Sequence, residues 1–303
     1  MPNLSIKNAQ VINEFIANYK QLNALGKKLF PQAIKELLEQ HATATDPAEN
    51  AFELISLLMR TTKLLKLSCI TKFKESSLYI NCKLLNANGL FSKENALVLL
   101  SHPAANRLFA AIHKLNEHNL LHGNEGQEHF NAVAQHLTAP DKAAHALITL
   151  HKSALLNAKN REAVTQHLTH PEAVAALLQR ISPWGLLTGE QGEKNLQQVI
   201  NHPHPDTILL AVELLNPCDG DLQDKFEVIM NSKASYAAAL SLLELEQENM
   251  PISAIKTSLT DAEQPGFVTT LLINNKRSLQ SSAPLPSSST NTNENAHPAP
   301  YRM

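Results

Sequence analysis

The stretch LTHPEAVAALLQR, Leu168–Arg180, sets the pattern of the chain: polar residues, a proline, an acid and then an apolar run. Two nearby stretches repeat this order, LTAPDKAAHALIT from Leu137 and INHPHPDTILLAV from Ile200. Proline is accepted in the first turn of a helix because its missing N–H would have no partner there. An acid in the same turn lies at the positive end of the helix dipole. Each copy therefore predicts the start of a helix.

The threonines of two copies are predicted to cap these helices. Thr169 precedes Glu172 by three residues, and Thr138 precedes Asp141 by three residues. In this spacing a threonine oxygen accepts a free backbone N–H of the first turn, which stabilises a helix by about 1 kcal/mol.

A second marker recurs with the same period. Short phrases that end in two apolar residues start at Leu85, Leu115, Leu150, Ile181 and, more weakly, Leu215, at separations of 30, 35, 31 and 34 residues. The prolines at positions 103, 140, 171 and 203 are separated by 37, 31 and 32 residues. Two markers with one period of about 33 residues indicate a tandem repeat.

Each repeat is predicted to be a helical hairpin. The first helix is expected to start at Ser92, Asn124, Asn157 or Thr188, and Gln191 after Thr188 completes a capping-box pattern. The proline turn follows, and the second helix is apolar on one face. One hairpin cannot bury its face alone, so we expect an all-α chain in which stacked hairpins form a right-handed α-solenoid.

The stretch GLLTGEQGEKNLQQVINHPHPDTILLAVELLN, from Gly185, resembles the tandem leucine-rich helical repeats of effector proteins from Legionella-type intracellular bacteria, whose consensus is close to G-L-L-T-x-x-N-x-x-x-V-I-N-H-P-x-P. The matching residues are Gly185, Leu186, Leu187, Thr188, Asn195, Val199, Ile200, Asn201, His202, Pro203 and Pro205. The resemblance covers about residues 84–248 and identifies a repeat type rather than an activity. The copy from Leu85 lacks the second proline, and the copy from Leu150 has Ala154 where the consensus has glycine.

This resemblance implies a function and a location. Such effectors are typically moved from the bacterial cytoplasm into the host cell cytosol by a type IV (Dot/Icm) secretion system. The start of the chain has no basic region followed by an apolar core, so a Sec signal is not expected. The first interpretation is therefore a non-catalytic scaffold in virulence that binds a host protein.

The chain divides into four parts by pattern. Residues 1–83 read as helical, either as divergent repeats that cap the solenoid or as a small separate bundle, with a helix start at Asp46 and Pro47. Residues 84–248 hold the repeats, and residues 249–276 are predicted to be a helical C-terminal cap. Residues 277–303 are rich in Ser, Asn, Pro and Thr with few apolar residues, so disorder is expected.

The composition of the chain argues against several fold classes, partners and kinds of site. Apolar residues make up 43% and aromatic residues 5%, with 9 glycines, which favours helices over a β-sandwich. The net charge of −2 gives no field that would attract nucleic acid. The 3 cysteines form no C-x-x-C pair, so neither a disulfide framework nor a thiolate zinc site is expected. No apolar run is long enough to span a membrane.

A basic segment, residues 60–74, gives a second interpretation from another class. Its cations are Arg60, Lys63, Lys66, Lys72 and Lys74, and apolar residues separate them. A basic amphipathic helix of this kind binds anionic lipid, which would make the protein a peripheral membrane adaptor. The alternative is a helix packed on the core with its lysines in solvent.

Trp184, the only tryptophan, lies in a predicted turn between repeats. An exposed tryptophan would anchor a protein partner, because tryptophan is enriched at binding hot spots. The alternative is packing against the neighbouring hairpin.

The 14 histidines do not have the spacing of a metal site. His102, His170 and His202 share one repeat position, and His136 and His167 share another, so the repeat consensus explains them. No G-x-S-x-G phrase or glycine-rich phosphate loop is present. We therefore expect no cofactor, no metal and no catalytic residues, with an enzyme whose site is unrecognised as the third interpretation.

Overall fold

The computed structural model describes residues 51–56, 76–215 and 221–281, together with Gln10, Glu14, Ala17 and Met59. Most of the region predicted for residues 1–83 and most of the predicted tail lie outside these residues. Residues 51–56 are helical, and Phe52 stacks on Phe91 with 5.7 Å between ring centroids. This helical segment therefore contacts the first complete hairpin.

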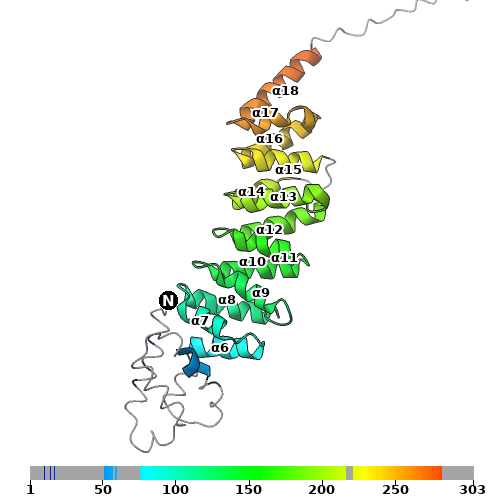
Figure 1. The fold of residues 1–303 in the computed structure, drawn as a ribbon. Helices are drawn as coiled ribbons and strands as arrows, with labels where there is room; N and C mark the ends of the chain where they lie inside the picture. Colours follow the sequence, from blue (N-terminus) through cyan, green and yellow to red (C-terminus); the bar gives the residue numbers. More distant parts are fainter. Residues whose placement is uncertain are drawn as a thin grey trace, which may run out of the picture.

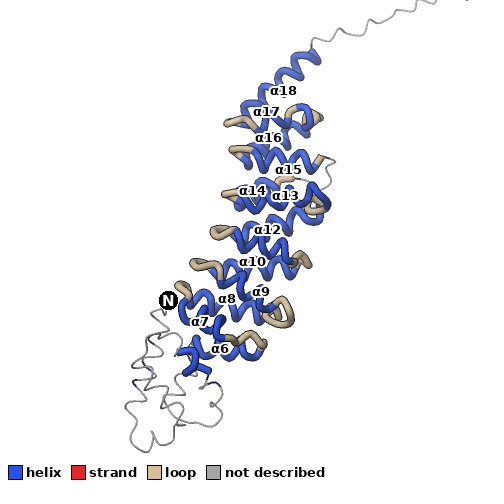
Figure 2. Tube along the Cα trace, in the orientation of Figure 1, coloured by secondary structure: helices blue, strands red, loops and turns tan. Residues whose placement is uncertain are grey.

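Every regular element in the described part of the chain is a helix, which confirms the all-α class there (Figure 2). The first helices of the hairpins are α7 Lys93–Ser101, α9 Gly126–Ala134, α11 Ala158–Gln166, α13 Gly189–Asn201, α15 Leu222–Asn231 and α17 Lys256–Thr260. The second helices are α6 Ser77–Ala87, α8 Ala105–Glu117, α10 Pro140–Lys152, α12 Pro171–Ile181, α14 Pro205–Val212, α16 Ser235–Gln247 and α18 Pro265–Ser281. Two short 3-10 helices, η1 Ser182–Trp184 and η2 Ile252–Ala254, complete the set.

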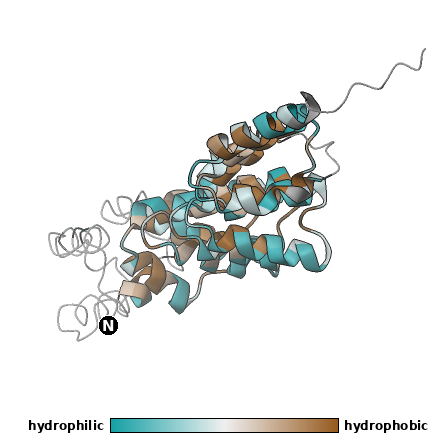
Figure 3. Cartoon of the chain, turned by 90° about the horizontal axis from the view of Figure 1, so that it is seen from above, coloured by the Kyte–Doolittle hydropathy of each residue, from teal (hydrophilic) through white to brown (hydrophobic). Residues whose placement is uncertain are grey.

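The helices follow one another in chain order along one long axis (Figure 1). Successive second helices pack against each other from α6 through to α18. The buried apolar side chains form one cluster that runs from Ala51 to Leu259. Figure 3 shows apolar and polar faces on the same helices, as expected when each helix buries one side. Each hairpin thus completes its core with its neighbours.

The junction from one hairpin to the next explains the recurring apolar phrase. In five of the described junctions the residue directly before the first apolar residue of the pair has a left-handed backbone: Gly89, Asn119, Ala154, Gly185 and Asn249. In three copies the next residue, a leucine, donates its N–H to the carbonyl five residues earlier, at 2.8 Å. This is the Schellman end of a helix, and it accounts for glycine or asparagine before the leucine.

The threonine caps predicted for the second helices are wrong. α10 and α12 begin at Pro140 and Pro171, so their N-caps are Ala139 and His170, and neither makes a side-chain cap hydrogen bond. The reason is that proline keeps the residue before it out of the helical region, so the helix starts at the proline. Thr138 and Thr169 therefore lie one residue too far out. The first-turn acids, by contrast, lie where predicted.

The starts predicted for the first helices are partly confirmed. Ser92 and Asn157 are N-caps whose side chains accept the N–H three residues on, at 3.2 and 2.9 Å. Thr188 is also an N-cap, but its hydroxyl donates to the carbonyl of Gly185 at 2.7 Å, so the capping box does not form. The start predicted at Asn124 is wrong, because α9 has Glu125 as its N-cap.

The last helix is longer than the composition predicted. α18 ends at Ser281, so residues 277–281 belong to it rather than to the tail. Near its end, Arg277 pairs with the Glu248 carboxylate and Lys276 donates to the Glu248 carbonyl. These contacts hold the last turns of α18 against the end of α16.

Candidate partner-binding surface

Large apolar side chains are exposed on the last three second helices. They are Leu210 on α14, Tyr236 and Leu240 on α16, and Phe267 and Leu271 on α18, with exposed fractions between 43% and 62%. Leu210 and Leu240 are the sixth residues of their helices, and Leu271 is the seventh. Since α14 packs on α16 and α16 on α18, the five side chains lie on neighbouring helices. Leu210, Leu240 and Leu271 stand at corresponding heights, and Tyr236 and Phe267 lie about one turn nearer the starts of α16 and α18. We call them the apolar patch.

The repeat itself does not require these residues. At the sixth position of the three preceding second helices, α8, α10 and α12, the chain has Ala110, His145 and Ala176, which are small or polar. The buried faces of these helices are nevertheless as apolar as those of the later ones. The apolar patch is therefore a property of the last three hairpins, and large contiguous apolar surfaces of this kind mark interaction sites.

Carboxylates border the apolar patch. Asp206 precedes Leu210 by four residues, Glu213 follows it by three, and Glu244 follows Leu240 by four, so each acid shares a helix face with a patch residue. All three acids are exposed, and none forms an ion pair within the described ranges. Their charges are therefore available to a partner.

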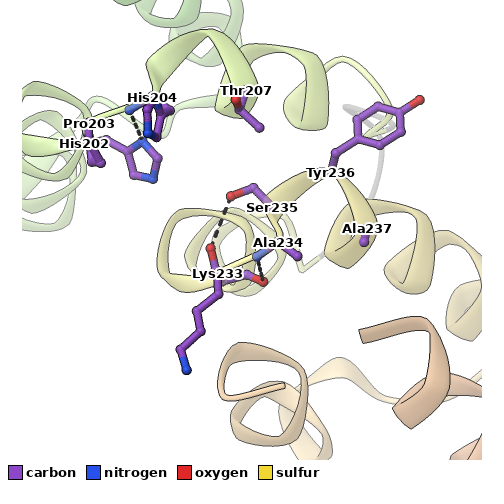
Figure 4. A pocket seen from close by; sticks show the side chains of 10 residues that line it. His202, Pro203, His204, Thr207, Lys233, Ala234, Ser235, Tyr236 and Ala237 are labelled. Atoms are coloured by element: carbon purple, nitrogen blue, oxygen red, sulfur yellow. Dashed lines mark hydrogen bonds between the residues drawn. The ribbon is translucent and has the colours of Figure 1, made fainter. Parts of the chain in front are cut away.

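A cavity of about 590 Å³ adjoins the apolar patch (Figure 4). The turn before α14 and the turn before α16 form its walls, and Tyr236 belongs both to its lining and to the patch. Ser235, which lines it, donates its hydroxyl to the Ser232 carbonyl at 3.3 Å. The cavity is therefore an open hollow between two turns that meets the apolar patch at Tyr236.

Trp184, predicted as a partner anchor, is half-buried in η1 and packs against the core. The guanidinium carbon of Arg180 lies 5.3 Å from the centroid of its ring. A cation at this distance is attracted to the face of the indole. One face of Trp184 is therefore already occupied, and the residue lies one hairpin before the apolar patch.

The basic segment predicted as a lipid site, with Arg60, Lys63, Lys66, Lys72 and Lys74, lies outside the described residues. Among the residues that the structure describes, no helix is both long enough and apolar enough to cross a bilayer.

The turn histidines hold the second helices in place. In the three turns before α8, α12 and α14, the Nδ1 atom of His102, His167 or His202 accepts the N–H of the N-cap residue at 3.1 Å. Ser232 does the same with its hydroxyl before α16, also at 3.1 Å. His167 thus shares the role of His102 and His202, which corrects the grouping made from the sequence. His170 is instead the N-cap whose N–H is bound.

The imidazoles of His167 and His136 also reach the next repeat. Nε2 of His167 lies 3.1 Å from the carbonyl oxygen of His202, and His136 lies beside the carbonyls of Val164 and Thr165. Burial lowers the pKa of His102, His136 and His202 below the ordinary value of 6.5. These rings are therefore neutral at pH 7, and the hydrogen bond between two consecutive hairpins is the one that His167 makes with the His202 carbonyl.

A row of buried polar residues, one in each first helix from α7 to α15, was missed at the sequence level. Four of them bond to a carbonyl of the preceding junction at 2.7 to 2.8 Å: Asn95 to Leu90, His129 to Leu120, Asn160 to Leu155 and Asn195 to Leu186. The buried Lys225 takes this place in α15 and pairs with Glu246 at 3.1 Å. One feature of the sequence could have indicated these residues. Four of the five stand directly before an apolar residue: Ala96, Phe130, Leu196 or Phe226.

Two features of the described residues bear on metal and thiol chemistry. No three His, Cys, Asp or Glu side chains among them lie close enough together to hold a metal ion. Burial raises the pKa of the Cys82 thiol to about 12, which makes it a poor nucleophile. Comparison of the chain with models of protein families, with curated proteins and with solved structures gave no match.

Proposed function

We propose that the chain is a non-catalytic protein-binding scaffold, built as a right-handed α-solenoid of hairpins of about 33 residues. The packing of α6 to α18 in chain order supports this architecture, because each hairpin contacts its neighbours. In such an arrangement the second helices form an extended surface that is suited to a protein partner.

The apolar patch is the observation that carries the proposal. Burial of a complete leucine or phenylalanine side chain contributes about 1.5–3 kcal/mol. Side chains such as Leu210 and Phe267 are 55% and 62% exposed, so each would contribute about 1 kcal/mol or more when a partner covers it. The five together would contribute about 5 kcal/mol, which is on the order of the low end of the cost of association, so polar contacts around the patch must add to them in a specific complex.

The resemblance of the repeats adds a setting to this proposal. The partner is a host protein, and the chain reaches the host cytosol through type IV secretion. A reporter fused to the chain should enter host cells infected with a bacterium that has this system. Entry should stop when the secretion system is inactivated. Equal entry from the inactivated strain would contradict this route.

Affinity purification from host lysate tests the scaffold function. The variant Leu210→Ser/Leu240→Ser removes exposed apolar area from α14 and α16. Leu137→Ser/Leu168→Ser is the matched control, because these leucines are 59% and 61% exposed but lie in turns outside the patch. The wild type and the control should retain the same host protein, and the patch variant should lose it. Retention by all three proteins, or by none, would contradict the proposal.

A further inference from the structure

We infer that the apolar patch binds one amphipathic helix of a partner protein, whose apolar stripe is flanked by lysine or arginine. This inference rests on the proposed scaffold function and adds the chemistry of the partner to it.

A helical partner follows from the backbone of the patch. The backbone groups inside α14, α16 and α18 are bonded within their own helices, so they offer no edge to which an extended segment could add as a strand. The patch therefore recognises side chains only. A partner segment that lies on it must satisfy its own backbone, which a helix does.

The size of the patch also fits a helix. Packed helices lie about 8–10 Å apart, so the surface from α14 to α18 is about 20 Å wide. A helix rises about 1.5 Å per residue, and about 14 residues would cover this width. Its apolar residues would meet Leu210, Leu240 and Leu271 in turn, and Tyr236 and Phe267 would lie along one side.

The charge around the patch selects a basic partner. Asp206, Glu213 and Glu244 are exposed and form no ion pair within the described part of the chain. The nearby cations are engaged, since Lys233 pairs with Glu263 at 3.9 Å and Arg277 pairs with Glu248. On the first helices, by contrast, carboxylates pair across repeats, as Glu128 does with Arg161. Unpaired carboxylates beside the patch would therefore attract cations on a partner.

The direct test uses two synthetic peptides of about 14 residues, the length that spans the patch. Both have leucine at helical spacing on one face, and the flanking positions are lysine in one and glutamate in the other. Binding to the full chain is followed by fluorescence anisotropy. The lysine peptide should bind and the glutamate peptide should bind at least about tenfold more weakly, with a difference that shrinks at high salt.

Variants locate the binding. Leu210→Ser/Leu240→Ser should weaken binding of the lysine peptide by about tenfold or more, as expected for central contacts. The control Leu137→Ser/Leu168→Ser should leave it unchanged. Asp206→Asn/Glu213→Gln/Glu244→Gln should remove the preference for lysine over glutamate. Circular dichroism of each variant checks that the helices are retained.

Four results would overturn the inference: equal binding of both peptides, equal loss in the patch and control variants, a dimer of the chain that Leu240→Ser dissociates, or lipid vesicles that bind through the patch.

The lysate experiment separates these from a failure of the scaffold function. If a host protein is captured through the patch but the lysine peptide does not bind, the scaffold stands and the helical basic partner is wrong. If the peptide binds but no host protein is captured, the scaffold proposal fails.

Discussion

At the scale of single residues, the junctions between hairpins need a residue with a left-handed backbone. In one junction this residue is an alanine, for which the conformation is strained. Ala154 has φ of 55°, where the other copies have glycine or asparagine. The Cβ atom makes this conformation unfavourable by about 1–2 kcal/mol. Ala154→Gly should therefore raise the free energy of unfolding by about 1 kcal/mol, as measured by urea denaturation.

The control for this change is Ala176→Gly, in the middle of α12. There glycine only loosens a helix and should lower the free energy of unfolding by about 1 kcal/mol. If both glycine variants were destabilised alike, the left-handed backbone at Ala154 would not be a source of strain.

A second residue-scale prediction concerns Gly192, near the start of α13. A Cβ atom at this position would lie 2.2 Å from the carbonyl carbon of Leu187, which is closer than any real contact. Gly192→Ala should lower the free energy of unfolding by about 1–3 kcal/mol, the usual range for overpacking. Gly266→Ala, which meets no atom within 4 Å, is the matched control and should not destabilise. A stable Gly192→Ala variant would show that the junction relaxes easily.

Single residues were the least predictable level of the fold. The acid and the proline that start α10, α12 and α14 were predicted correctly because their effect is local to the first turn. The prediction of threonine caps was wrong because two local preferences compete. Thr169 favours a helix that starts directly after it, whereas Pro171 keeps His170 out of the helical region, and the effect of the proline is the stronger. The bonds of the turn histidines could not be predicted, because the carbonyl that His167 meets belongs to the next hairpin.

At the scale of elements, the existence and order of the helices between residues 84 and 260 followed from the sequence. Apolar spacing and a shared period are properties of the chain itself, and they fix which segments are helical. The end of α18 was missed because a run of polar residues gives no apolar period. Contacts of Lys276 and Arg277 with Glu248 support that end of the helix instead.

The turns between paired helices predict a dependence on pH. Burial lowers the pKa of His102, His136 and His202, so the unfolded chain binds more protons than the folded chain below the ordinary value of 6.5. The stability that depends on these neutral rings is therefore fully present above about pH 6.5, and the free energy of unfolding should fall as the pH drops below it. Urea denaturation at about pH 7.5 and about pH 5.5 measures this loss, ahead of the carboxylates that titrate at lower pH.

The variant His102→Ser separates the histidines from other groups. Ser232 already accepts the turn N–H before α16, so serine keeps this bond without a titrating ring. The loss of stability between the two pH values should be smaller in His102→Ser than in the wild type, whatever its stability at the higher pH. An equal loss would show that His102 does not contribute to the pH dependence.

At the scale of the whole molecule, the candidate surface could not be found from the sequence. Leu210, Leu240 and Leu271 lie in apolar runs in which exposed and buried leucines look alike, since Leu242 beside them is fully buried. Only the packing of three helices from different repeats shows which side chains share a surface. Trp184 was predicted as a partner anchor from its residue type alone, whereas in the structure its ring contacts Arg180.

Because the hairpins pack in chain order, the last helix can be deleted without removing the packing of the earlier ones, and the deletion measures how much this helix stabilises the fold. Val268, Leu272 and Ile273 of α18 pack against the core, and α18 is the last helix among the described residues that covers α16. Deleting residues 262–303 would expose that side of α16 and remove part of its burial. We expect the free energy of unfolding to fall by about 2–4 kcal/mol, the order of burying two or three apolar side chains in part.

Deleting residues 282–303 is the matched truncation, because it leaves α18 complete. This segment has few apolar residues to bury, so the melting temperature and the helical circular dichroism signal should stay at the values of the full chain. The longer deletion should lower the melting temperature and also remove Phe267 and Leu271 from the apolar patch, so it should weaken binding of the lysine peptide. If the shorter deletion lowered the melting temperature as much, the stabilising contacts would lie beyond Ser281 rather than in α18.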